Sequence, residues 1–124
     1  MPRYNEQDFD PPAPMAWVIL RDPNGDAMLG GVPMLIDTGA DITLVPRSSV
    51  EELGVSLVNE GGYELVGFGG EQTFAEAVRL EMSWDKRTFR GLFVVADQSW
   101  GILGRNVLNT ISLTLDGPNL SWTA

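Results

Sequence analysis

A carboxylate at the end of an apolar run is the first feature of this sequence that could do chemistry. Asp37 follows the apolar residues 34–36 and opens the segment DTGAD, residues 37–41. Asp and Gly are also the residues that tight turns favour, so a lone Asp-Thr-Gly triplet indicates a turn more readily than a catalytic group. The context favours catalysis, because a buried strand would hold the carboxylate on a rigid element and Gly39 lets another backbone approach closely.

The residue types that are missing narrow the chemistry further. The chain has 124 residues and contains no histidine and no cysteine. By itself it cannot form a Ser-His-Asp triad, a thiol nucleophile or an ordinary zinc site. Hydrolytic chemistry would therefore depend on carboxylates, hydroxyls and backbone groups, and we expect neither a cofactor nor a metal.

The charge balance disfavours two classes of partner. The net charge is −9, and Lys86 is the only lysine. No basic stripe is present to neutralise phosphates, which disfavours both nucleic acid and a membrane surface as partners. The polar start MPRYNEQDFDPP is unlike a signal peptide, and no apolar run approaches the ~20 residues of a transmembrane helix. We expect a soluble, cytoplasmic protein or a piece of a longer precursor.

The elements that must position Asp37 are short strands. Residues 1–14 form an extended arm, because prolines at 11, 12 and 14 prevent a helix. From Met15 on, apolar β-prone runs alternate with turn signals every 8 to 12 residues or so. A short helix is predicted over 46–53, with Ser48 or Ser49 as its cap and Gly54 as its stop. The remaining predicted runs are 15–20, 32–37, 42–45, 55–58, 63–83 as a hairpin, 91–96, 100–103, 111–116 and 119–123, with one or two helical turns at 105–109.

This pattern predicts one all-β domain over residues 15–124, a barrel or sandwich with one or two short helices. Neither an internal repeat nor a second domain is visible in the sequence.

Three segments together resemble the retropepsin-like aspartic proteases. LIDTGADITLV, residues 35–45, is similar to their active-site segment, and ILGRNVL, residues 102–108, to the Gly-Arg-Asn segment near their C-terminus. VGFGG, residues 66–70, is similar to the glycine-rich tip of their flap. The resemblance covers residues from about 15 to 124. It implies a small closed acid-protease barrel with one lobe per chain.

The same resemblance implies an aspartic endopeptidase that works as a homodimer. Asp37 of each chain would meet at the two-fold axis, and the pair would hold one proton and activate a water. The substrate would be an extended peptide or protein with apolar residues beside the scissile bond.

Further roles come from the family residue by residue. Thr38 would hydrogen-bond across the axis, Ala40 is the variant typical of the retroviral type, and Arg105 would pair with Asp41 or a nearby loop. Arg105 is also compatible with a plain surface residue, and Leu35 with simple core packing. The residues expected to contact substrate are Leu35, Gly39, Asp41, Gly67, Phe68, Gly69, Trp100 and Ile102.

Some residues depart from the retroviral pattern. Ile42 stands where many retroviral enzymes have a second acidic residue, and Trp100 is bulkier than usual, which would reshape its pocket. The segment PRSSVEELG, residues 46–54, resembles cellular and bacterial members more than viral ones. The tail 116–124 continues past the usual end of the retroviral chain, and a hairpin there could rebuild the dimer sheet.

Two other functions remain open from the sequence. One is a catalytically silent dimerisation or peptide-binding module with the same fold, because fold does not imply function. The other is an unrelated small β-barrel that binds a ligand and uses Asp-Thr-Gly as a turn. Activity that disappears on Asp37→Asn while the dimer survives would separate the protease from both.

Overall fold

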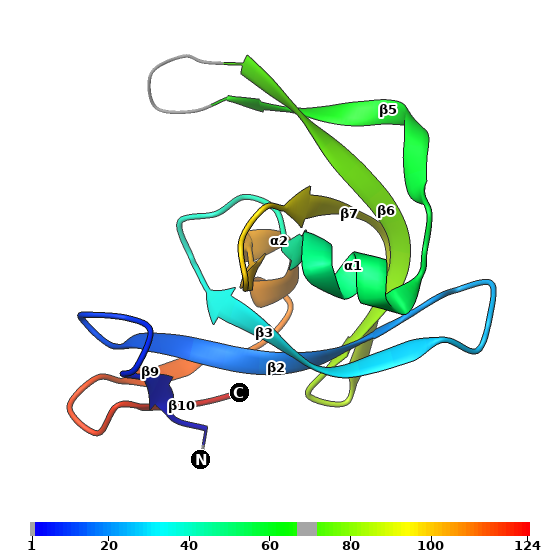
Figure 1. Ribbon diagram of the computed structural model, residues 1–124. Coiled ribbons are helices and arrows are strands. Elements are labelled where there is room, and N and C mark those ends of the chain that lie inside the picture. The colour runs from blue at the N-terminus through cyan, green and yellow to red at the C-terminus, as the bar shows by residue number, and fades with distance from the viewer. Residues whose placement is uncertain (1, 67–71) are drawn as a thin grey trace.

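The computed structural model describes residues 2–66 and 72–124 (Figure 1). Short strands make up most of the fold, as the sequence predicts. The strands are β1 (Tyr4–Asn5), β2 (Ala13–Arg21), β3 (Met28–Ile36), β4 (Leu44–Pro46), β5 (Leu57–Val66), β6 (Gln72–Trp84), β7 (Arg87–Ala96), β8 (Gly101–Leu103), β9 (Thr114–Asp116) and β10 (Ser121–Thr123). The helices are α1 (Arg47–Leu53) and α2 (Arg105–Leu108).

Six of the strands close into a barrel. The main sheet has the order β1-β2-β3-β8-β4-β7-β6-β5, and β6 also pairs with β2. That extra pairing joins β2, β3, β8, β4, β7 and β6 into a ring, so the central strands leave no open edge. β5 lies outside the ring and forms a long hairpin with β6 that extends away from the barrel (Figure 1). The predicted fold class, a small closed all-β barrel with short helices, is confirmed.

Alternation of side chains along β2 and β3 builds the core. Along β2, Val18 and Leu20 are buried while Trp17 and Ile19 are exposed. The β3 residues 32, 34 and 36 are buried in the same way, and those at 33 and 35 are half-buried on the opposite face. Because successive side chains of a strand point to opposite faces, one face of this hairpin fills the barrel and the other is open to solvent.

Helix α1 begins and ends close to the predicted positions, but its start has a different cap. Pro46 is the N-cap in an extended conformation, and no side-chain hydrogen bond caps the helix. The expected capping by Ser48 or Ser49 is therefore wrong, because Pro46 starts the helix early enough to place both serines within its first turn. Gly54 ends the helix as predicted, with φ of 79° and its N–H bonded to the carbonyls of Val50 and Glu51.

The two ends of the chain meet at one corner (Figure 1). Tyr4 N donates to Leu120 O at 2.8 Å, and Trp122 N donates to Pro2 O at 3.0 Å. The buried indole Nε1 of Trp122 donates to Met15 O at 2.9 Å, which fastens β10 to β2. β1 also pairs with β2, and β9 with β10 as a separate hairpin. Among residues 2–66 and 72–124, no helix is long and apolar enough to cross a membrane.

Candidate active site

Asp37 follows β3 directly and is held by the backbone on both sides. Its N–H donates to Leu103 O at 3.1 Å, which continues the β3–β8 pairing for one more residue. Its carboxylate Oδ1 accepts the N–H of Gly39 at 2.9 Å, and its carbonyl accepts the N–H of Ala40 at 3.2 Å. Asp37 is half-buried. The carboxylate is therefore fixed in direction and still reachable by a water molecule.

Gly39 leaves room for this arrangement. A Cβ at that position would lie 3.2 Å from Asp37 Oδ1, closer than ordinary van der Waals contact. Any other residue at 39 would push against the oxygen that the Gly39 N–H binds. The close turn around the carboxylate thus explains the glycine of the triplet without invoking a positive φ.

Parallel pairing of β3 and β8 brings the two sequence motifs together. Leu35 pairs with Ile102, so that the residues after each strand leave the sheet side by side. Arg105 N then donates to Ala40 O at 2.8 Å, and its Nη1 donates to Thr38 O at 2.7 Å. Arg105 Nη2 forms an ion pair with Asp41, which is one of the two pairings that the resemblance implies. The guanidinium thus clamps the loop 38–41 from both of its sides.

The buried hydroxyl of Thr43 holds the residues on both sides of Arg105. Thr43 is 2% exposed, and its Oγ1 accepts the N–H of Gly104 at 3.0 Å and donates to Asn106 Oδ1 at 2.8 Å. No role for Thr43 or Asn106 could be predicted from the sequence. A threonine six residues after the candidate Asp carries no signal of its own, because its partner lies 63 residues away.

The structure describes some of the residues expected to contact substrate and not others. Leu35, Trp100 and Ile102 are half-buried on adjacent segments, and Asp41 and Gly39 are exposed on the loop beside Asp37. Gly67, Phe68 and Gly69, the predicted flap tip, lie outside the described residues. The hairpin of β5 and β6 that carries them is in place. Substrate contact by all of these residues stays a prediction.

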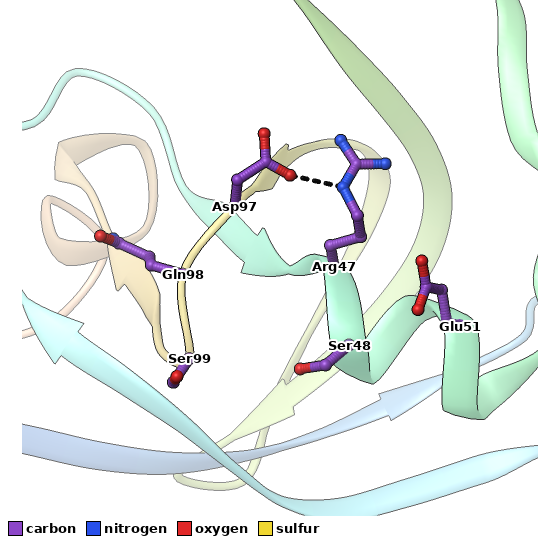
Figure 2. A pocket seen from close by; sticks show the side chains of 6 residues that line it. All are labelled: Arg47, Ser48, Glu51, Asp97, Gln98 and Ser99. Carbon is purple, nitrogen blue, oxygen red and sulfur yellow. Dashed lines mark hydrogen bonds and ion pairs between the residues drawn. The ribbon is translucent and has the colours of Figure 1, made fainter.

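Arg47 joins three elements near the base of that hairpin. It opens α1, and its guanidinium binds Glu76 of β6 at 3.0 Å and Asp97, which follows β7. Figure 2 shows the bond from Arg47 to Asp97 across a polar cavity of about 350 Å³. The guanidinium donates hydrogen bonds to Asp97 and to Glu76, and these bonds, that to Asp97 first, raise the pKa of Arg47 above its usual value, so the guanidinium stays charged across the physiological range. No local pattern in the sequence predicts this ion-pair cluster.

We expect Arg47→Gln to loosen the hairpin base while barely changing global stability. Glu76 and Asp97 are 52% and 76% exposed, and such pairs contribute below about 1 kcal/mol. The rate of amide hydrogen exchange in residues 76–80 should rise in the variant. High salt should raise the same rate in wild type, because salt screens the same ion pairs. Arg79→Gln is a matched control, because Arg79 is exposed and lies on β6, the strand that carries Glu76. Unchanged exchange in Arg47→Gln would show that the cluster does not hold the hairpin.

Comparisons with known proteins agree with this geometry. The family model described as retroviral aspartyl protease matches residues 24–116, and the chain belongs to this family. A solved structure titled EIAV protease complexed with the inhibitor HBY-793 matches with a TM-score of 0.60 and 23% identity, covering 86% of this chain and 91% of that one. A comparison with curated proteins found no match. The fold is thus retropepsin-like, and fold and family support aspartic protease activity in general.

Proposed function

We propose that this protein is a homodimeric aspartic endopeptidase whose catalytic dyad is Asp37 from two chains. The observation that carries the proposal is the half-buried Asp37 carboxylate on a clamped loop that occurs once per chain. One carboxylate cannot act as both acid and base toward the same water, so a second must come from another molecule. Thr38 and Gly39 are exposed beside it, which leaves the loop accessible to a second copy.

The mechanism follows from two carboxylates at close distance. Like charges about 3 Å apart cannot both ionise, so the pair retains one proton and titrates as a unit. The ionised member takes a proton from a bound water, which attacks the peptide carbonyl. The protonated member donates first to the carbonyl oxygen and then to the leaving amine. This route needs no covalent intermediate.

The substrate class follows from the strands around the site. Leu35 and Ile102 form a half-buried cross-strand pair beside Asp37, and Trp100 lies two residues before Ile102. An extended peptide that lies across this apolar face would place alternate side chains against it, because successive side chains of an extended chain point to opposite sides. We therefore propose cleavage of extended peptides with apolar residues beside the scissile bond.

Cleavage should be fastest below neutral pH. As pH rises, the dyad loses its shared proton and with it the general acid, so kcat/KM should fall toward alkaline pH. Digestion of a mixed peptide library between pH 3 and pH 9, analysed by mass spectrometry, measures this profile. Circular dichroism at each pH confirms that the protein remains folded. A flat profile to pH 9 would contradict the shared proton.

The same experiment tests the function itself, provided that the oligomeric state is measured alongside. Sedimentation velocity gives the concentration above which the chain is dimeric, and activity should appear over the same range. If a dimeric sample cleaves no peptide, the peptidase is contradicted and a catalytically silent peptide-binding module becomes the favoured function. Cleavage by a monomer would contradict the dyad of two chains.

A further inference from the structure

The N-terminal arm brings an aromatic side chain onto a predicted substrate wall. The rings of Phe9 and Trp100 meet edge to face, with centroids 4.9 Å apart and planes at 65°. Trp100 lies just before β8, two residues ahead of Ile102, so the arm reaches the surface that continues from the candidate active site. No feature of the sequence had connected residues 9 and 100.

The arm is built into the fold and is not a loosely lying segment. β1 pairs with β2 through Tyr4 and Pro14 and through Asn5 and Ala13. The Asn5 side chain accepts the N–H groups of Gln7 at 2.9 Å and Asp8 at 3.0 Å, which shapes the turn that leads to Phe9. The strand pairing and this turn together position Phe9 against Trp100.

A cavity of about 240 Å³ opens between the arm and the β2–β3 hairpin. Most of its lining side chains are apolar or aromatic. They are Asn5, Asp8, Phe9, Met15, Trp17, Pro33, Ser99 and Trp100.

The cavity lies on the same face of the β2–β3 hairpin as Leu35, two residues before Asp37. Its floor includes the cross-strand pair of Trp17 and Pro33, and the next pair on the same face is Met15 with Leu35. Pro33 and Leu35 alternate along the open face of β3, and Asp37 follows two residues later. At ~3.3 Å per residue the cavity lies about 13 Å from Asp37 along the strand, which is about four residues of an extended peptide.

The chemistry of the lining selects its occupant. Three aromatic side chains, from Phe9, Trp17 and Trp100, line the cavity, and Trp17 is 62% exposed. The single ionisable residue of the lining is Asp8. Its Oδ2 accepts Asn5 Nδ2 at 3.0 Å, and a carboxylate can accept further bonds. Aromatic faces beside one carboxylate suit a cation on an apolar stem, and a planar guanidinium both stacks on rings and binds carboxylates.

We propose that this cavity is a subsite for an arginine side chain, or less well a lysine, about four residues from the scissile bond of the substrate. Phe9, Trp17 and Trp100 stack against the stem and the guanidinium, and Asp8 binds its N–H groups. As a cleavage subsite, the assignment rests on the proposed peptidase function. As a binding site for a cationic side chain, it stands on the lining alone.

The experiment tests the binding of a cationic side chain and its effect on cleavage separately. Tryptophan fluorescence measures binding of a blocked hexapeptide, Ac-Ala-Ala-Ala-Arg-Ala-Ala-NH2, and of its citrulline twin, which has the same shape without the charge. We expect the arginine peptide to bind about tenfold more tightly. Asp8→Asn should remove most of this difference, and Phe9→Leu should reduce it while filling similar space. Asp26→Asn changes the net charge equally on an exposed turn outside the cavity and should leave the tenfold difference in place.

Cleavage kinetics test whether the cavity is also a substrate subsite. For a library peptide that the enzyme cleaves, arginine four residues from the scissile bond should raise kcat/KM about tenfold over citrulline, and Asp8→Asn should remove the gain. Equal binding of the two hexapeptides would overturn the proposal, whatever the cleavage shows. Preferential binding without cleavage of any peptide would sustain the cationic site and overturn the peptidase. Cleavage with preference at another position would overturn the subsite alone.

Discussion

Asp37→Asn should lower kcat/KM at least about a thousandfold and leave the fold and the dimer intact. The Asp37 carboxylates of the two chains are proposed to supply, between them, the base that activates water and the acid that protonates the amine, and each such role contributes roughly 10² to 10⁴ in rate. An amide of the same shape can still accept the Gly39 N–H through its carbonyl oxygen. The measurement is cleavage of the best library peptide by each protein at the optimum pH of wild type.

The controls for this substitution are stability and oligomeric state. Replacing both carboxylates by amides removes the unfavourable pairing of two acidic groups at the axis, so the free energy of unfolding should stay the same or rise. Sedimentation velocity should show the same dimer, and Asp26→Asn, on an exposed turn, should keep full activity. A large loss of stability in Asp37→Asn, or activity within tenfold of wild type, would contradict the dyad.

Gly104→Ala should be the most destabilising single methyl in the site. A Cβ at residue 104 would overlap the backbone carbonyl of Ile42, which cannot swing aside like the end of a side chain. The backbone of Gly104 is extended, with φ of −91°, so the requirement is space and not a special conformation. Relief of the overlap would pull Gly104 N away from Thr43 Oγ1, now 3.0 Å, and shift Arg105 with it.

We expect a loss of about 3 kcal/mol in the free energy of unfolding, at the upper end for overpacked sites. Urea denaturation followed by fluorescence measures it. Gly30→Ala is the matched control, because a Cβ there meets no atom within 4 Å and its φ requires no glycine. Cleavage by the folded fraction of Gly104→Ala should also fall, since Arg105 clamps the loop beside Asp37. Equal free energies of unfolding for Gly104→Ala and Gly30→Ala would show that the backbone at residues 42 and 104 accommodates the added methyl at little cost.

Patterns with a local cause could be predicted from the sequence. The strand before Asp37 and the helix stop at Gly54 each depend on residues close in the chain. The hairpin turn that the structure shows at Asp85 and Lys86 has an equally local cause. At that turn both residues have positive φ, 48° and 65°, as a two-residue hairpin requires. The barrel itself followed from the density of short strands together with the resemblance carried by three segments.

Contacts between distant segments could not be predicted in this way. The hydrogen bond from Thr43 to Asn106, the ion pairs of Arg47 and the contact of Phe9 with Trp100 join residues 29 to 91 positions apart. Each depends on barrel closure and not on a local pattern. The arm was expected to be extended, but only the structure shows that it pairs with β2 and with the tail.

The meeting of the two chain ends determines how the molecule would respond to force. Residues 2–4 and 120–122 run antiparallel, with both chain ends on the same side, so a pull on the ends would open their hydrogen bonds one at a time. Unzipping of this kind resists force far less than the simultaneous rupture of many bonds. The terminal strands would peel first and carry Phe9 away from Trp100, while the closed ring of strands, from whose β3 the Asp37 loop leaves, would bear load last.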